Sequence, residues 1–318
     1  MLRSMYSAIS GMNAFQTELD VVGNNIANVD TTGYKASRTE FSDILSQTIA
    51  GASQPSNAGL GGTNPQQVGL GVNVASIYTP FTQGADQETG VNTDVALDGD
   101  GYFMVSPSAT TNTPTAADTA PTVTTVGANP VYFTRAGDFS VDASGDIVTP
   151  DGSKLLGYLQ GSGSAPTNVQ DLGAVNVGVV PSTGGQPVPG NFTFNANGTI
   201  TVTDPTTNQT VETWVVPLAK FFNPSGLSKI GNNQFQQTPD SGQFGASAAA
   251  ANAGASMGQA GSNGFATFRV GALEASNVNL TDEFTNMIVA QQAFDANSKV
   301  INTDNNILST VLTLEQQA

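Results

Sequence analysis

The sequence contains neither cysteine nor histidine. Without cysteine there are no disulfides and no thiolate nucleophiles, and without both residues the usual zinc ligand sets are excluded. Histidine is also the side chain most often used as a general base near neutral pH, so catalysis would have to rely on carboxylates, hydroxyls or lysine. No pair among the 25 Asp and Glu residues stands out as the carboxylate pair of a secreted hydrolase. We therefore expect no enzyme activity, no catalytic residues, no cofactor and no metal.

Positive charge is scarce as well. The chain has 9 Lys and Arg against 25 Asp and Glu, a net charge of −16 at pH 7, and residues 39–134 contain no Lys or Arg. This balance repels polyanions, so we expect no nucleic-acid partner. Charged residues make up 11% of the 318 residues, against about 25% in ordinary soluble domains. The surface must consist largely of small polar side chains, which suit packing against other protein.

Long apolar runs are also missing. No stretch approaches the roughly 20 apolar residues of a membrane span, so we expect no direct membrane insertion. The first 15 residues lack the continuous apolar core, about 7–15 residues long, of an ordinary secretory signal.

Apolar residues recur with helical spacing at both ends of the chain. The sequence predicts one helix of about 25 residues from Leu2 and another of about 35 residues from Leu280, with Asn279 as its N-cap. The N-terminal stripe consists of Leu2, Met5, Ile9, Met12, Leu19 and Ile26. The C-terminal stripe consists of Met287, Phe294, Ile301, Leu308 and Leu312.

These two stripes need partners. They can pair with each other as a coiled coil within one molecule, or with helices of neighbouring copies. A pair of helices that projects from a β-rich body leaves part of each stripe exposed, and exposed apolar stripes indicate association. We therefore expect the stripe residues to form a coiled-coil and polymerisation surface.

The middle of the chain has the short alternating segments and turn residues of β-structure. We expect residues 131–159 to form a meander with turns at 142–145 and 150–152, and residues 245–264 to form a loop. Strands are expected at 94–105 (two short strands), 131–135, 138–141, 147–149, 154–159, 192–194, 200–203 and 211–216.

Two acidic segments resemble fragments of calcium loops. They are the run from Asp98 to Gly101 and the group Asp142, Ser144 and Asp146. Neither has the twelve-residue spacing of an EF-hand with its terminal glutamate. Both lie where hairpin turns are expected, so turn chemistry is the favoured interpretation.

A dense polar loop follows the first predicted helix. Asn and Gly at this place are typical of a helix C-terminus, because they tolerate the left-handed conformation. That reading explains the residue types but not so dense a run directly after a heptad helix. The residues concerned are Asn24, Asn25, Ala27, Asn28, Thr32, Gly33, Tyr34 and Lys35.

The same loop carries a resemblance to a known family. The run SAISGMNAFQTELDVVGNNIANVDTTGYKASRTEF (7–41) resembles the signature of the bacterial flagellar rod and hook family, and residues 271–314 are similar to its C-terminal segment. Residues 94–105 and 132–158 resemble the shared β-domain of that family. The matched regions cover roughly half of the chain, at the places where the family has them.

The resemblance implies a mixed α and β, multidomain fold, with long terminal helices paired as a coiled coil and discontinuous antiparallel β-domains. Within the family, residues 61–72 and 216–235 are similar to hook segments, and no extra rod-type linker is recognised after 47–49. The domains are expected at 1–30 with 280–318 (helical coiled coil), 31–75 (linker), 76–159 with 211–279 (β-rich core) and 160–210 (small outer insertion).

The function implied by the resemblance is that of a structural subunit of the flagellar hook, the flexible joint that transmits torque from rod to filament. The alternative is a subunit of the distal rod, a rigid shaft. The implied partners are other copies of the chain in a head-to-tail helical tube, the distal rod, hook cap and hook–filament junction proteins, and the flagellar export apparatus. The implied location is the extracellular flagellum, reached without a cleavable signal peptide.

Overall fold

The computed structural model describes residues 2–54, 62–107, 130–160, 172–179, 188–189, 191–203, 210–242 and 255–316. The chain divides into two units. Unit 1 comprises Met1–Val29, Ala36–Pro80 and Val278–Ala318, and unit 2 comprises Asp30–Lys35 and Phe81–Asn277. The short segment 30–35 therefore belongs to a different unit from the residues on either side of it. Among the described residues, no helix has the length and apolar character that crossing a membrane requires.

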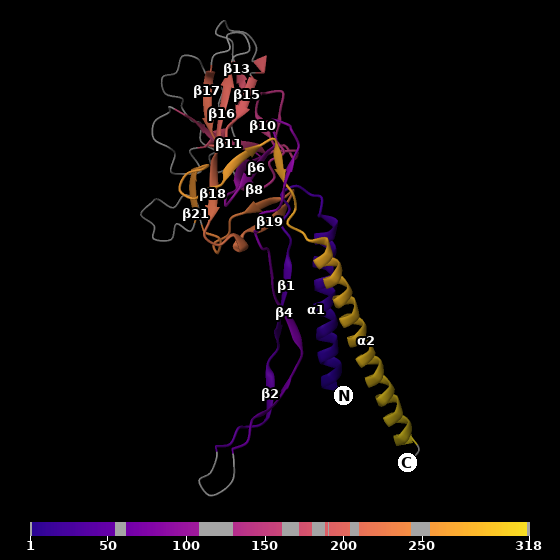
Figure 1. The fold of residues 1–318 in the computed structure, drawn as a ribbon. Helices are drawn as coiled ribbons and strands as arrows, with labels where there is room; N and C mark the ends of the chain where they lie inside the picture. The colour runs from indigo at the N-terminus through magenta and orange to yellow at the C-terminus, as the bar shows by residue number, and fades with distance from the viewer. Residues whose placement is uncertain are drawn as a thin grey trace. The chain divides into compact units, whose positions relative to one another are not determined.

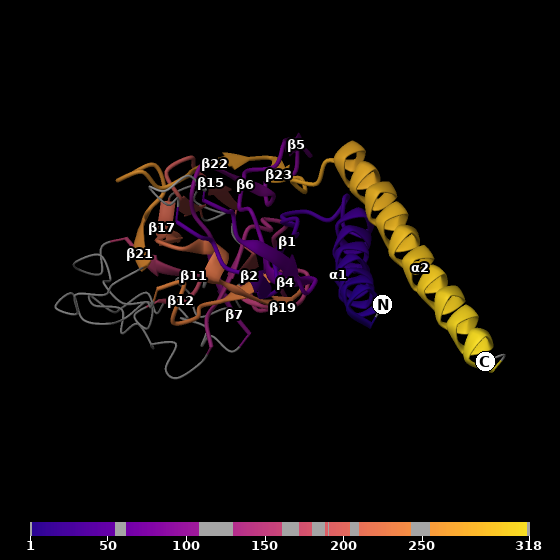
Figure 2. The same cartoon turned by 90° about the horizontal axis from the view of Figure 1, so that it is seen from below.

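Two helices dominate unit 1 and confirm the expectation of long terminal helices. Helix α1 (Leu2–Ala27) has 26 residues and helix α2 (Leu280–Gln316) has 37. They lie side by side in Figures 1 and 2. The predicted N-cap is also confirmed, because the side-chain oxygen of Asn279 accepts a hydrogen bond of 3.1 Å from the backbone N–H of Thr281.

A β-ribbon completes unit 1 within the range expected to be a linker. Its strands are β1 (Arg38–Asp43), β2 (Ser46–Ala50), β3 (Gln66–Gly69) and β4 (Val72–Tyr78), paired β1 with β4 and β2 with β3. Helix α1 packs against β1 and β4 as well as against α2. The ring centroids of Phe15 on α1 and Phe41 on β1 are 5.6 Å apart. Helix α1 thus has partners on two sides, so a single apolar stripe does not describe its environment.

Unit 2 is built from strands, and every strand pair in the described part of the chain is antiparallel. Its main sheet has the order β15-β16-β17-β11-β7-β8-β20-β19, with β9, β10 and β12 attached to this path. Smaller pairs are β6 with β22, β5 with β23, β13 with β14 and β18 with β21. The bounds are β5 (Asp86–Glu88), β6 (Val95–Asp98), β7 (Phe103–Ser106), β8 (Tyr132–Thr134), β9 (Ser140–Val141), β10 (Ile147–Val148), β11 (Lys154–Leu159), β12 (Gly173–Ala174), β13 (Gly178–Val179), β14 (Val188–Pro189), β15 (Asn191–Phe194), β16 (Thr199–Thr203), β17 (Thr210–Val215), β18 (Pro217–Phe221), the 3₁₀ turn η2 (Pro224–Gly226), β19 (Ser228–Gly231), β20 (Gln234–Gln236), β21 (Ala255–Gln259), β22 (Thr267–Val270) and β23 (Ala272–Glu274).

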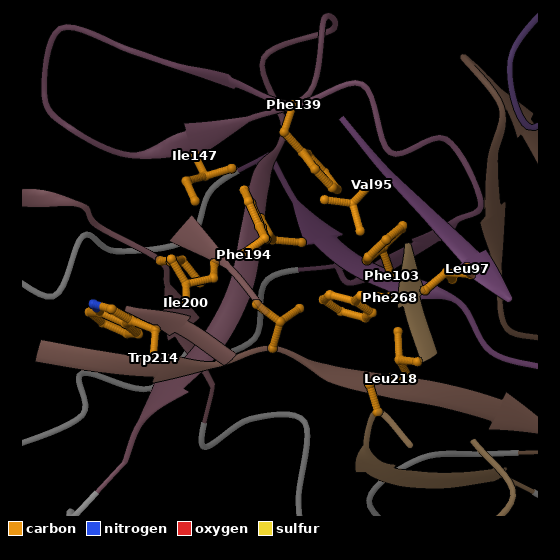
Figure 3. Close-up of a cluster of buried hydrophobic side chains, with 14 of the residues drawn as sticks. Val95, Leu97, Phe103, Phe139, Ile147, Phe194, Ile200, Trp214, Leu218 and Phe268 are labelled. Carbon is orange, nitrogen blue, oxygen red and sulfur yellow. The ribbon is translucent and has the colours of Figure 1, made fainter. Parts of the chain in front are cut away.

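Two apolar clusters form the core of unit 2. Successive side chains of a strand point to opposite faces, so Phe103 and Val105 of β7 lie in one cluster and Met104 lies in the other. The first cluster, shown in Figure 3, includes Trp214, the only tryptophan of the sequence. Because the central strands are covered on both faces, their sequences are apolar without alternation.

Most of the expected strands are confirmed, but two expectations about unit 2 are wrong. Strand β8 does not continue the meander to β9; it pairs with β7 and β20, since tertiary pairing brings β20 next to it. The expected loop at 245–264 contains β21, which pairs with β18. Of the expected insertion at 160–210, residues 161–171, 180–187, 190 and 204–209 lie outside the described residues.

The acidic segment 142–146 behaves as a turn. The run 98–101 does not close the expected hairpin, because β6 pairs with β22 and β7 pairs with β8 and β11. The side-chain oxygen of Asp142 accepts hydrogen bonds from the backbone N–H groups of Ser144 (2.8 Å) and Asp146 (2.9 Å). Gly145 has φ +84°, the left-handed conformation that favours glycine in such turns. In the part of the chain that the structure describes, no group of three or more acidic side chains is placed to hold a metal ion.

Candidate functional site

The contact between α1 and α2 is antiparallel and has one constant register. Three pairs fix it within the described helices: Ser4 with Asp304, Gly11 with Asn297 and Asn25 with Glu283. The two residue numbers add to 308 in each of these pairs. The helices therefore keep one alignment from the first turn of α1 to its last.

Small residues of α1 are buried near this contact. Gly11 faces Asn297 of α2, and Ala8 and Ala14 are buried on the same helix. A Cβ on Gly11 would lie 2.8 Å from the side-chain nitrogen of Asn297, so a larger residue at this point requires the Asn297 side chain to shift. Small side chains allow a close approach of the two helices, and they were not part of the predicted stripe.

The predicted α1 stripe lies beside this buried row. Met5, Met12, Leu19 and Ile26 are half-buried and Ile9 is exposed, while the side chain of Leu2 is outside the described residues. On α2 the prediction coincides with the covered side. Met287, Phe294, Ile301 and Leu308 are half-buried, whereas Leu312 is exposed. The less exposed row of α2 alternates in steps of four and three: Glu283, Met287, Ala290, Phe294, Asn297, Ile301, Asp304 and Leu308.

Where residues of α1 and α2 lie opposite each other, the layers of Ser4, Glu18 and Asn25 contain polar groups. The hydroxyl of Ser4 donates a hydrogen bond of 2.6 Å to the carboxylate of Asp304, which is buried. The amide of Asn25, 1% exposed, donates a hydrogen bond of 3.2 Å to the carboxylate of Glu283. Burial raises the pKa of Glu283, and the hydrogen bond from Asn25 and the charge of Arg38 oppose this rise. Burial likewise raises the pKa of Glu18.

Asn25 also holds the chain where it returns to unit 1. Its side-chain nitrogen donates to the backbone carbonyl of Ser37 at 2.8 Å, and its side-chain oxygen accepts from the N–H of Ser37 at 2.9 Å. Nearby, the side chain of Asn28 donates to the backbone carbonyl of Asn24 at 2.9 Å, which satisfies a C-terminal carbonyl of α1. Ala27 is exposed. The loop at 24–35, named here the signature loop, therefore ends α1 with its first half. Asn25 of this half also binds Ser37, the point at which the chain is back in unit 1 after residues 30–35.

The second half of the signature loop is an anchor inside unit 2. Gly33 adopts φ +69°, and a Cβ there would lie 2.7 Å from the backbone nitrogen of Ala136. The N–H of Gly33 donates to the carbonyl of Glu274 at 2.8 Å. The side chain of Asn233 donates to the carbonyl of Thr32 at 2.9 Å.

Lys35 ends this anchor in a fully buried ion pair. Its ammonium lies 2.5 Å from the carboxylate of Glu274, with both side chains at 0% exposure, and donates to the carbonyl of Thr82 at 2.8 Å. Arg135 is 3.5 Å from the other oxygen of the same carboxylate. Burial lowers the pKa of the Lys35 amine, the charge of Glu274 raises it, and the charge of Arg135 lowers it again. One carboxylate thus neutralises two buried cations only in part.

Tyr34 and the Lys35 backbone have contacts with β19. The ammonium of Lys229 lies 5.0 Å from the ring centroid of Tyr34 and donates to the carbonyl of Lys35 at 2.8 Å. The N–H of Asn277 contacts the carbonyl of Tyr34 at 3.4 Å. These contacts explain why so many polar residues follow the first helix: within unit 2, they hold Tyr34 and Lys35 against β19 and Asn277.

Sequence reasoning missed the partners of this anchor. Glu274 and Arg135 are far from Lys35 in sequence, and nothing in their local pattern marks them as buried charges. On the helices, the alternation of four and three steps that includes Asn297 and Asp304 was visible in the sequence. It was overlooked because both residues are polar.

Three family models match segments of the chain. The model described as "Flagella basal body rod protein" matches residues 5–35, which include α1 and the signature loop. The model described as "Flagellar hook protein FlgE/F/G D1 domain" matches residues 123–182. The model described as "Flagellar basal body rod FlgEFG protein C-terminal" matches residues 269–314, which include Glu274 and most of α2.

Individual relatives agree with these matches. The chain is 40% identical over 316 residues to the flagellar basal-body rod protein FlgG of Bacillus subtilis, with 99% of this chain and 100% of the relative covered. It is 44% identical over 160 residues to the flagellar hook protein FlgE of Treponema pallidum, which covers 50% of this chain and 30% of the relative. The flagellar hook protein FlgE of Borreliella burgdorferi is 27% identical over a 475-residue alignment that covers 99% and 100%.

The chain therefore belongs to the flagellar rod/hook family. Proteins of this family are structural parts of the flagellum and not enzymes, which confirms the expectation that this chain is not an enzyme. Both a rod and a hook relative match over their whole length, but the rod relative is 40% identical and the hook relative 27%, which favours the rod alternative over the hook interpretation.

Proposed function

We propose that the chain is a subunit of the distal rod, which polymerises head to tail into a rigid tube. The observation that carries this proposal is the end-to-end match with a rod protein, in which both chains are covered almost completely. The hook relative of comparable coverage is less similar, and its alignment extends over 475 positions. A hook subunit therefore differs from this chain by large insertions, whereas a rod subunit does not.

Uncovered apolar surface in unit 1 supports polymerisation. Helix α2 leaves Val300, Ile307, Val311 and Leu314 exposed, a second row about 100° from the row that faces α1. Because paired residue numbers of α1 and α2 add to 308, Leu2 lies opposite residue 306. The part of α2 after residue 306 therefore extends past the first residue of α1. Exposed apolar rows of this kind are typical of association surfaces.

The β2–β3 hairpin supports the same conclusion. All described residues of both strands are exposed, and Leu45, which precedes β2, is 79% exposed. A two-stranded hairpin without further packing is marginal in water. A neighbouring copy in the polymer would give this hairpin its missing apolar contacts, and the predicted stripe residues would complete the interface.

Under this proposal, neighbouring copies are the main partner of the chain. An open head-to-tail contact continues into a helical tube, because it does not close on itself. A distal rod adjoins the hook. The second partner proposed for this chain is therefore the hook subunit, in place of the hook cap and hook–filament junction proteins expected for a hook protein. Export through the flagellar apparatus and location in the basal body belong to the same proposal.

The hook remains the second candidate, because the local identity to a hook protein reaches 44% over 160 residues. Electron microscopy of the purified chain under polymerising conditions separates the two. A rod subunit is expected to form straight tubes, whereas curved tubes would support the hook. If the chain forms no tubes at the concentrations at which related subunits polymerise, both candidates are contradicted.

A further inference from the structure

The apolar rows of α1 and α2 cannot define their own alignment. The apolar residues of α2 repeat every seven residues, at Met287, Phe294, Ile301 and Leu308. A slip of one heptad therefore replaces each apolar layer by another of the same kind. The helices nevertheless keep a single register, in which paired residue numbers add to 308.

The polar layers respond differently to such a slip. In the observed register Ser4 meets Asp304, Asn25 meets Glu283, and Glu18 comes opposite Ala290. Asp304 and Glu283 thus each accept a hydrogen bond from a neutral donor, and Glu18 is kept apart from Glu283. These pairings satisfy polar groups that would otherwise be buried without partners.

A slip of seven residues in either direction removes this match. If the paired numbers added to 301, Glu283 would lie opposite Glu18, and two carboxylates would face each other in a partly buried layer. If they added to 315, Asp304 would lie opposite Gly11 and Asn25 opposite Ala290. Asp304 would then be buried without the hydroxyl of Ser4, and the hydrogen bond between Asn25 and Glu283 would be lost, which is unfavourable.

We propose that these polar layers, named here the register lock, select the observed antiparallel alignment of α1 with α2 against pairings slipped by one heptad. The lock residues are Ser4, Gly11, Glu18, Asn25, Glu283, Asn297 and Asp304.

The absence of cysteine makes the register directly measurable. A Cβ on Gly11 would lie 3.2 Å from Cγ of Asn297, so the variant Gly11→Cys/Asn297→Cys places two cysteines at contacting positions of the two helices and reports the native register. Gly11→Cys/Ala290→Cys reports the slipped register, in which paired numbers add to 301. Oxidation of each full-length double variant, followed by non-reducing electrophoresis and peptide mapping, gives the two disulfide yields.

The lock is weakened by Asn25→Leu/Glu283→Leu and compared with Asn13→Leu/Asn305→Leu, which makes the same kind of change at exposed positions of the two helices. We expect the ratio of slipped to native disulfide to rise by at least about tenfold in the weakened background and to stay constant in the control. An equal ratio in both backgrounds would overturn the proposal.

A further variant keeps the test decisive. If far-UV circular dichroism shows that the weakened variant has lost its helices, Glu18→Gln replaces it; this change removes only the repulsion in the slipped register and must still raise the slipped yield. If no tubes form, the proposed function fails, while the disulfides within one chain still decide the register lock.

Discussion

The buried ion pair that holds the signature loop makes the sharpest prediction about unit 2. In the variant Glu274→Gln the only carboxylate between Lys35 and Arg135 loses its charge. Lys35 keeps its hydrogen bond to the carbonyl of Thr82, and Arg135 keeps that to the carbonyl of Gly99 at 2.9 Å. Two buried cations then face each other without an anion, which is the unfavourable outcome of breaking a buried pair.

The magnitude follows from burial. Removal of one partner of a fully buried pair lowers the free energy of unfolding by about 3–5 kcal/mol. For a unit the size of unit 2, this corresponds to a decrease in melting temperature of roughly 6–20 °C. The unfolding of unit 2 is measured by the emission of Trp214, because this single tryptophan is fully buried in its core.

The pH dependence provides a second readout. Burial already lowers the pKa of Lys35, and the charge of Glu274 opposes this, so Glu274→Gln lowers the pKa further. Above the folded pKa of Lys35, the unfolded chain binds one more proton than the folded chain, and stability rises with pH until the unfolded pKa. The deficit of the variant is therefore expected to shrink as the pH rises toward the pKa of about 10.4 that a lysine has in the unfolded chain.

The matched control is Glu88→Gln. Glu88 pairs with Arg269 at 2.8 Å, but its side chain is 77% exposed, so the same chemical change should leave the melting temperature nearly unchanged. If Glu274→Gln lowers the melting temperature no more than Glu88→Gln does, the buried pair does not hold the loop and the reasoning is wrong.

Other predictions concern single positions. Gly33→Ala should destabilise unit 2 by about 2 kcal/mol more than Gly90→Ala, because both glycines have φ near +70° but only Gly33 is crowded; urea unfolding followed by Trp214 emission checks this, and equal losses would contradict it. Burial raises the pKa of Glu283 above 4.5, so the folded helices hold its proton longer than the unfolded chain. Helix stability should therefore fall as the pH rises through the window just above 4.5, and Glu283→Gln should reduce this dependence in circular dichroism melts; an unchanged pH slope would refute it. Val311→Ser/Leu314→Ser should change monomer stability by less than about 0.5 kcal/mol yet abolish tubes in electron microscopy, because both side chains are exposed; normal tubes would exclude them from the interface.

Local patterns in the sequence predicted the elements with regular spacing well. The heptads at both ends predicted α1 and α2 closely, and Asn279 was recognised as the N-cap because its chemistry is local. The hairpin with its turn at 195–198 was equally accessible, because alternation and turn residues lie within a few positions of each other. The resemblance of residues 7–41 and 271–314 to the rod and hook family predicted a structural protein of that family, and the lack of cysteine and histidine agreed with it.

Pairings between distant segments were not accessible in this way. The β1–β4 ribbon was read as a linker, since its strands are exposed and lack clear alternation. Strand β8 pairs with β20, about 100 residues away, and no local feature of β8 indicates that choice. The hook was preferred to the rod because the C-terminal segment that carried the resemblance matches a model common to rod and hook proteins.

The sequence alone determined that this chain has two long helices around an antiparallel β-rich middle, because helix periodicity, turn residues and composition act over short distances. Only the tertiary structure decided how charges and small residues are used: Lys35 is buried against Glu274, and Gly11 lies against Asn297. Burial and register depend on groups hundreds of residues apart. Their free energy exists only when the folded chain removes both partners from water.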